Sequence, residues 1–218
     1  MRLVEKLRSP AYEGSIHGPP EICWSRISSL GDIRLSERIV GTNPCLNKTE
    51  EDRYLDGPFH RVDAPSRSKL ASDFEPGQRL SIQGIVSNCS GPLSCINLDV
   101  WNATDGGCYE SFGGCPAIPG HPEQYRLRGQ MVSDAEGKYG FETVLPGAYL
   151  NGSAYRPRHI HIILSLPYTI TTPRMGNTNH LVTQLYFEGD PYIKGDYAAD
   201  HPSANNRIIA LSKTDPKL

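Results

Sequence analysis

The 218-residue chain contains 21 glycines and 18 prolines, spread along its whole length. Glycine adds backbone freedom and proline lacks an amide proton, so such frequent breaks exclude long helices. From Arg79 onward, short runs rich in Val, Ile, Leu and aromatic residues alternate with turn residues, which is the pattern of short strands. The sequence therefore predicts a mainly β protein.

Seven segments have the composition of strands, and their number and spacing predict an antiparallel β-sandwich. The segment Asp134-Ala135-Glu136-Gly137 predicts a hairpin turn between two of them. No amphipathic helix is present that could cover a parallel sheet. The predicted strands are residues 80–87, 95–101, 126–133, 139–145, 158–166, 181–187 and 207–211.

The first third of the chain lacks periodicity. Proline pairs and turns such as Pro19-Pro20 and Asn43-Pro44 break every regular stretch between residues 1 and 75. We predict that residues 1–75 form an irregular arm packed on the core, and that residues 76–218 form one β-sandwich domain.

The charge and hydropathy exclude two classes of partner. The 22 Lys and Arg residues nearly balance 24 Asp and Glu residues, so the chain lacks the basic field that nucleic-acid binding requires. The mean hydropathy is −0.44, and no run of 18 apolar residues could cross a membrane. We therefore expect neither a nucleic-acid nor a membrane partner.

Six cysteines lack the paired CxxC spacing of a zinc site. The separations Cys89–Cys95 and Cys108–Cys115 suit disulfides that close single loops. Four Asn-x-Ser/Thr sequons add to this and predict a disulfide-bonded, secreted glycoprotein, although a cytoplasmic protein with free thiols stays open. The start MRLVEKLRSP has no apolar signal core, so we expect any signal peptide to be absent from this chain. The sequons begin at Asn47, Asn88, Asn102 and Asn151.

His159 and His161 stand two residues apart at the start of a predicted strand. Side chains at this spacing point to the same face, with Cα atoms about 6.5 Å apart, so both imidazoles could bind one metal ion. Two polar residues on a solvent-facing strand give the same pattern. Tyr109 and Tyr149 each follow a glycine-containing turn near a strand end, but most of the 11 tyrosines must be packing residues.

A set of motifs in chain order resembles the intradiol ring-cleavage dioxygenases, the family of catechol 1,2-dioxygenase and protocatechuate 3,4-dioxygenase. The set consists of Tyr109, Tyr149, the segment Arg156-Pro157-x-His159-x-His161, and the segment Thr-Gln-Leu-Tyr-Phe-Glu-Gly-Asp-Pro at residues 183–191. Trp101 and the segment Asp56-Gly57-Pro58-Phe59 also resemble family positions. The resemblance covers residues 80–192.

This resemblance implies a mononuclear non-haem Fe(III) held by Tyr109, Tyr149, His159 and His161. Tyr109 and His159 would lie in the plane, with Tyr149 and His161 axial. The implied reaction cleaves a catechol-type diol between its two hydroxylated carbons with O2, giving a cis,cis-muconate-type product. Phenolate oxygens are hard anionic donors suited to ferric iron, and a bound metal ion can hold a tyrosine ionised although its ordinary pKa is about 10.

The resemblance also assigns catalytic roles. Tyr149 would leave the iron and take one substrate proton, Arg156 would stabilise negative charge on the substrate ring, and Gln184 would lie on the same side of the pocket. Arg156 could instead cap a strand end. Glu188 and Asp190 are expected to order the turn before Pro191 rather than bind metal. The remaining histidines considered are expected to be surface or loop residues: His121, His180 and His201.

The chain departs from the family pattern in two places. Arg158 stands where the family usually has a small residue, which predicts a more positive or more crowded pocket rim. The helical dimerisation segment of catechol 1,2-dioxygenases is not recognisable in residues 1–75, so monomer and homodimer stay open. The cysteines and sequons resemble the extracellular members, whose substrates include plant-derived and lignin-derived diphenols.

Two other functions compete with the ferric enzyme. The first is a ferrous oxygenase in which His159, His161 and a carboxylate such as Glu188 hold the metal. The second is a non-catalytic, disulfide-stapled β-sandwich binding module. Under the family interpretation, the disulfide Cys108–Cys115 would brace the loop that carries Tyr109.

Overall fold

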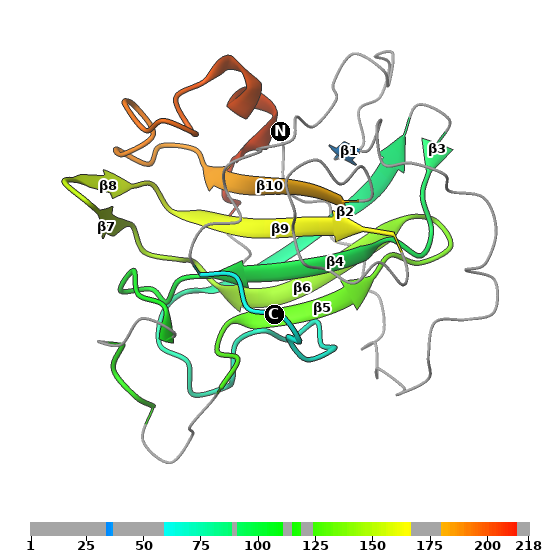
Figure 1. The fold of residues 1–218 in the computed structure, drawn as a ribbon, viewed down its shortest axis with the longest axis horizontal. Coiled ribbons are helices and arrows are strands. Elements are labelled where there is room, and N and C mark those ends of the chain that lie inside the picture. Colours follow the sequence, from blue (N-terminus) through cyan, green and yellow to red (C-terminus); the bar gives the residue numbers. More distant parts are fainter. Residues whose placement is uncertain are drawn as a thin grey trace.

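A computed structural model describes residues 34–36, 59–88, 91–110, 115–118, 124–166 and 180–212, which form two stacked sheets and a small hairpin (Figure 1). In the first sheet, β2 (Arg79–Asn88) pairs with three strands, and the second sheet has the order β11-β10-β9-β4-β5. The partners of β2 are β1 (Arg34–Ser36), β3 (Gly91–Pro92) and β6 (Lys138–Val144). The second sheet consists of β4 (Asn97–Asn102), β5 (Arg128–Val132), β9 (His159–Ser165), β10 (His180–Phe187) and β11 (Ile208–Ile209).

The hairpin of β7 (Tyr149–Asn151) and β8 (Ala154–Arg156) projects beyond the beginning of β9 at one end of the sandwich (Figure 1). A 3-10 helix, η4 (Pro202–Arg207), leads into β11. No helical segment within the described ranges is long and apolar enough to cross a membrane.

The predicted fold class is confirmed, because all seven predicted strands are present and the sheets pack as a sandwich. One pairing departs from the prediction: β10 and β11 run parallel. Another correction concerns Asp134, which does begin a tight turn, with its carboxylate accepting from the amides of Glu136 and Lys138. That turn leads from β5 in one sheet to β6 in the other, so it does not join two neighbouring strands of one sheet. The short strands β1, β3, β7 and β8 were not predicted.

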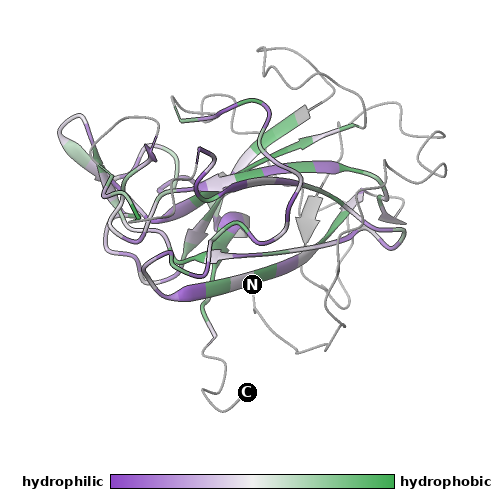
Figure 2. Ribbon diagram, turned by 90° about the horizontal axis from the view of Figure 1, so that it is seen from below, coloured by the Kyte–Doolittle hydropathy of each residue, from purple (hydrophilic) through white to green (hydrophobic). Residues whose placement is uncertain are grey.

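The main hydrophobic core lies between the two sheets. β2 and β6 contribute Ile82, Val86 and Phe141 from one side. The second sheet contributes alternate residues of its strands from the other side: Leu98, Val100, Ile160, Ile162, Leu164, Leu181 and Leu185. Hydrophobic and hydrophilic residues succeed one another along the strands (Figure 2), as expected where one face of each sheet is buried.

β9 differs from this pattern because all seven of its residues are buried. Ile160, Ile162 and Leu164 face the core between the sheets, so His159, His161 and Ile163 lie on the opposite face. A second cluster of Trp101, Ala103, Tyr109, Ile163 and Val182 covers that outer face. The pair of histidines therefore does not face solvent.

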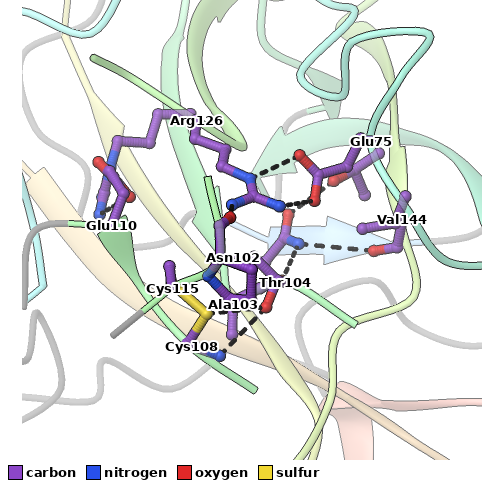
Figure 3. A network of polar contacts seen from close by, with 12 residues as sticks. Glu75, Asn102, Ala103, Thr104, Cys108, Glu110, Cys115, Arg126 and Val144 are labelled. Atoms are coloured by element: carbon purple, nitrogen blue, oxygen red, sulfur yellow. Dashed lines mark hydrogen bonds and ion pairs between the residues drawn. A yellow bond between two sulfur atoms is a disulfide. The ribbon is translucent and has the colours of Figure 1, made fainter. Parts of the chain in front are cut away.

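Residues 59–75, the described end of the predicted arm, lie against the edges of both sheets. Ser66 bridges to Gln130 in β5, and Lys69 bridges to Glu142 in β6. Glu75 reaches further in, where its carboxylate pairs with Arg126 beside the loop that follows β4 (Figure 3). The strand β1 pairs with β2, while residues 1–33 and 37–58 lie outside the described ranges. The boundary at residue 76 stays a prediction.

The disulfide between Cys108 and Cys115 is confirmed, with a Cα–Cα distance of 5.6 Å. Cys95 is also disulfide-bonded, and none of the described cysteines is free. Cys23, Cys45 and Cys89 lie outside the described residues. The arrangement of Cys108–Cys115 closes the loop that contains Tyr109, as expected from the family resemblance.

The sequons have different surroundings. Asn102 is not placed to carry a glycan, because its side chain is buried, accepts from Thr143 Oγ1 at 2.8 Å and donates to the Ala103 carbonyl at 2.8 Å. Asn151 and Ser153 are exposed at the tip of the β7–β8 hairpin. Asn47 and the two residues that complete the sequon at Asn88, residues 89 and 90, lie outside the described ranges.

Candidate metal centre

His159 and His161 are buried, with 2% and 1% of their surfaces exposed. Both rings project from β9 to the same side, and their Nε2 atoms are 3.1 Å apart. The Nδ1–H of His159 donates to the carbonyl of Pro157 at 2.6 Å, which leaves the lone pair of His159 Nε2 directed toward His161. The sequence-based expectation of two imidazoles on one face is therefore met.

Tyr149 and Tyr109 lie next to this pair. The ring of Tyr149 is 5.5 Å from that of His159, and the ring of Tyr109 is 5.6 Å from that of Tyr149. The structure thus brings together all four residues that the family resemblance selects, from the two strands β7 and β9 and from the loop that carries Tyr109. Tyr109 is 4% exposed and Tyr149 is half-buried.

The two tyrosine-bearing loops contact each other through their backbones. The amide of Gly147 donates to the Thr104 carbonyl at 2.8 Å. A Cβ atom at Gly147 would lie 2.2 Å from the carbonyl oxygen of Asp105, so only glycine permits this approach. Gly107, with φ +77°, closes the turn before Cys108 and Tyr109. These glycines explain why Tyr109 and Tyr149, 40 positions apart in the sequence, meet at one point.

The site has the chemistry of a metal centre. A metal ion binds imidazole nitrogen at about 2.0–2.1 Å, so two nitrogens at right angles about one ion are about 3.0 Å apart. The measured Nε2–Nε2 distance of 3.1 Å agrees with this value. The phenol oxygen of Tyr109 is buried and has no hydrogen-bond partner among the described residues. A cation would satisfy this oxygen, which otherwise is costly to bury.

Burial changes the protonation of the site residues in the metal-free protein. Burial, together with the positive charge of Arg156, lowers the pKa of His159 to about 3, so its imidazole is neutral at pH 7 and able to bind a metal. Burial raises the pKa of Tyr109 well above its usual value, and Tyr149 adds to this effect. Burial also raises the pKa of Tyr149 to about 12, although the charge of Arg156 opposes the shift. Both phenols are therefore protonated until a cation replaces their protons.

Arg156 is held at the edge of the site by three partners. Its Nε donates to Asp196 Oδ2 at 2.7 Å, its Nη2 to Gln184 Oε1 at 3.0 Å and its Nη1 to the Tyr197 hydroxyl at 3.0 Å. The guanidinium is buried at the end of β8 and acts on the pKa of both Tyr149 and His159. Arg156 is therefore built into the site and does not simply cap a strand end.

Gln184 lies on β10 directly opposite His161 in the register. Its Nε2 is 3.3 Å from His161 Nδ1, and its Oε1 accepts from both Arg156 and the Tyr186 hydroxyl. The amide therefore links the arginine to the histidine pair.

Several residues that support the site were not selected as functional from the sequence. The indole of Trp101 stacks on His161 with a centroid distance of 4.6 Å and an angle of 4°. The ring of Phe59 stacks on Tyr109 at 4.2 Å and 10°. The sequence marks Trp101 and Phe59 only as positions that resemble the family, since a single aromatic residue carries no signal of its own. Asp196 and Tyr197 come from the loop after β10, where no periodicity marks them.

The carboxylates near β10 do not complete a ferrous site. Glu188 is exposed after the end of β10. Asp190 accepts from the amides of Arg158 and Tyr192, which is the turn-ordering role expected for it. Within the described residues, no group of three or more His, Cys, Asp or Glu side chains is placed to hold a metal ion. The His/His/carboxylate alternative thus finds no third ligand in the part of the chain described here.

Two of the other predicted positions, Arg158 and His201, are exposed. The side chain of Arg158 is 45% exposed and its Nε is 3.8 Å from Asp190 Oδ2, so a carboxylate offsets the charge expected at the rim. His201 is exposed, and His180 begins β10. His121 lies outside the described residues.

Comparison with known proteins identifies the family. A family model described as Dioxygenase matches residues 55–216. The chain is 32% identical over 183 residues to a chlorocatechol 1,2-dioxygenase of Rhodococcus opacus, with 74% of this chain and 65% of the relative covered. It is 33% identical over 197 residues to the protocatechuate 3,4-dioxygenase beta chain of Burkholderia cepacia, with 84% and 80% covered.

A solved structure agrees with the sequence relatives. The dioxygenase domain of a dioxygenase and carbohydrate-binding protein fusion from Streptomyces sp. SirexAA-E superimposes with a TM-score of 0.58 and 27% identity, and the match covers 77% of this chain and 90% of that domain. The chain belongs to the intradiol ring-cleavage dioxygenases, a family of oxidoreductases. It spans just under two thirds of the length of the Rhodococcus enzyme.

Proposed function

We propose that this chain is a non-haem Fe(III) dioxygenase that cleaves catechol-type diols between the two hydroxylated carbons, with O2 as co-substrate. The observation that carries the proposal is the meeting of Tyr109, Tyr149, His159 and His161 around the 3.1 Å pair of Nε2 atoms. Family membership supports the assignment, because catechol-type substrates appear in the names of the relatives.

Two imidazoles and two phenols form a donor set suited to ferric iron. The phenolates are hard anionic ligands, and together they offset two of the three positive charges. When bound, the ferric ion would hold the catechol through both oxygens and make its ring reactive toward O2. The side chains of the protein would accept the substrate proton and stabilise the negative charge of the substrate.

Tyr149 is the residue of the four that is suited to accept a substrate proton. It is half-buried, whereas Tyr109 is 4% exposed and lies beneath Phe59. Its pKa of about 12 in the metal-free protein means that its oxygen, once free of a cation, readily takes a proton at neutral pH. The proton would move from the substrate hydroxyl to the Tyr149 phenolate oxygen.

Arg156 would stabilise the negative charge of the bound substrate. Its side chain cannot turn away, because Asp196, Gln184 and Tyr197 each bind a different nitrogen of the guanidinium. A fixed cation in a buried site interacts more strongly with developing charge than a solvated one. Gln184 accepts a hydrogen bond from this cation and contacts the ring of His161, so it holds both side chains in place.

The proposal is tested by the colour and iron content of the purified protein. Charge transfer from phenolate to ferric iron should give a red-brown protein with stoichiometric iron. Tyr109→Phe and Tyr149→Phe should each weaken the visible band and slow turnover. Tyr155→Phe is the matched control, because Tyr155 is 50% exposed on β8 and should leave the band unchanged.

Other outcomes would point to the competing functions. A colourless protein with stoichiometric iron would contradict the phenolate ligands and favour ferrous chemistry. Failure to bind iron after reconstitution would favour a non-catalytic binding module. Loss of fold stability alone in Tyr149→Phe would return Tyr149 to a packing role.

We also propose that the chain works in an oxidising, extracellular environment. The disulfide Cys108–Cys115 closes the loop that carries Tyr109, and Asn151 is exposed with Ser153 at a hairpin tip where a glycan has room. Expression through a eukaryotic secretory pathway should give a glycan that Asn151→Gln removes and Asn102→Gln does not. Thiol titration should find Cys108 and Cys115 oxidised, and free thiols at both positions would contradict the proposal.

A further inference from the structure

Arg128 is the first residue of β5 and stands opposite Trp101 in the register. Its side chain is 2% exposed, although it carries a full positive charge. A buried guanidinium requires partners that offset the free-energy cost of its desolvation. Two of those partners belong to the surroundings of Tyr109, which the mechanism above requires as an ionised phenol.

The first partner is Glu110, the residue that directly follows Tyr109. Arg128 Nε donates to Glu110 Oε1 at 2.9 Å, and Nη2 is 3.4 Å from Oε2. The second is the backbone of Phe59, whose carbonyl accepts from Arg128 Nη1 at 2.7 Å. Because the Phe59 ring stacks on Tyr109 at 4.2 Å, one guanidinium fixes both the chain that carries Tyr109 and the ring that covers it.

Arg128 also acts on the phenol directly. Its Cζ atom is 5.8 Å from the centroid of the Tyr109 ring, within the range in which a cation is attracted to an aromatic face. The attraction increases when the ring becomes an anion.

We propose that Arg128 is a positioning residue for Tyr109, which holds the phenol in place and stabilises it as the phenolate that binds iron. This inference rests on the proposed function, since it assigns the residue that prepares one of the four ligands. Glu110 holds the guanidinium in place and partly offsets its positive charge.

The test measures the charge-transfer band of the iron-loaded protein and its retention of iron against a chelator. Removing a cation beside the phenolate raises the energy of the donor electrons, so Arg128→Met should shift the band to longer wavelength. Loss of a residue that supports a metal ligand typically weakens metal binding, so iron retention should fall on the order of 10-fold. Arg128→Lys, which keeps the charge without the fork of donors, should restore most of the band position.

Glu110→Gln provides a control of opposite sign. With the carboxylate neutralised, the charge of Arg128 is less compensated, so the band should shift to shorter wavelength. General loosening of the loop would not reverse the direction between the two variants. Tyr149→Phe serves as the background in which the band reports Tyr109 alone. Arg126→Met removes another buried arginine, which pairs with Glu75, and should lower stability without moving the band.

The inference is overturned if Arg128→Met keeps the band position and the iron of the parent protein and loses only thermal stability. It is also overturned if Arg128→Met and Glu110→Gln shift the band in the same direction. If Arg128→Met does not fold, Arg128→Lys and Glu110→Gln decide by the same criteria. A parent protein without any band would instead refute the proposed function, so the two failures are distinguishable.

Discussion

Glu75 and Arg126 form two parallel hydrogen bonds, from Nε to Oε2 and from Nη2 to Oε1, both 2.7 Å long. Their side chains are 0% and 9% exposed. Arg126 also donates through Nη1 to the carbonyl of Pro116, next to the disulfide loop. The pair therefore ties the end of the N-terminal segment to the chain around Cys115.

Glu75→Leu would leave the Arg126 guanidinium buried without its counter-charge. Removal of one partner of a buried pair costs about 3–5 kcal/mol. Against a total stability of about 5–15 kcal/mol, that is a large fraction of what holds a domain folded. With a urea m-value of about 2 kcal/mol/M, the unfolding midpoint should fall by roughly 2 M.

The assay is equilibrium unfolding in urea without reductant, so that the disulfide stays closed. Arg126→Met should cost a similar amount, since it leaves the carboxylate unpaired. The double variant Glu75→Leu/Arg126→Met removes both charges and should be more stable than the sum of the single effects predicts. A loss below about 1 kcal/mol in Glu75→Leu, or strict additivity in the double variant, would refute this reasoning.

Three further predictions concern the loops and the protonation of the site. Gly147→Ala should push the Tyr149 loop away from the Asp105 carbonyl. We expect the unfolding free energy to fall by about 1–3 kcal/mol and iron retention against a chelator to weaken. Wild-type stability and iron binding in this variant would count against the contact. The iron-free protein should lose stability as the pH falls from about 6.5 to about 3, because His159 takes up a proton in the unfolded state and not in the folded state. The stability of the parent and of His159→Gln, measured against pH, should therefore differ in this window. Identical stability curves would speak against the neutral buried imidazole. Thr143→Val should cost about 1–3 kcal/mol, because it leaves the buried Oδ1 of Asn102 without its donor, whereas an unchanged melting temperature would show that the bond contributes little.

Much of the fold follows from local sequence patterns. Runs such as residues 80–87 and 158–166 are rich in Val, Ile and Leu, are bounded by turn residues, and become β2 and β9. The errors arise where the outcome depends on distant partners. Asp134 does form a turn, but only tertiary packing decides that the next strand joins the other sheet. Strands of two or three residues, such as β3 and β7, are too short to carry a periodic signal.

The candidate site is only partly readable from the sequence. The spacing of His159 and His161 predicts a shared face, but it leaves open whether that face is covered, and the cover comes from Trp101 and Tyr109. Tyr109 and Tyr149 were selected by resemblance, because nothing in their neighbourhood separates them from other tyrosines. Arg128 lies 19 positions after Tyr109, and its role depends on a guanidinium that crosses the loop to Glu110. Such contacts between distant segments leave no trace in a single sequence.

The proposed function requires that Tyr109, Tyr149, His159 and His161 hold a ferric ion that presents a catechol to O2. The most direct measurement is an absorbance spectrum during anaerobic titration of the iron-loaded protein with catechol, followed by admission of air. We expect a catecholate band that grows with catechol and then decays as a cis,cis-muconate appears in the ultraviolet. The claim is contradicted if no catecholate band forms on the iron-loaded protein, or if the ring opens outside the two hydroxylated carbons.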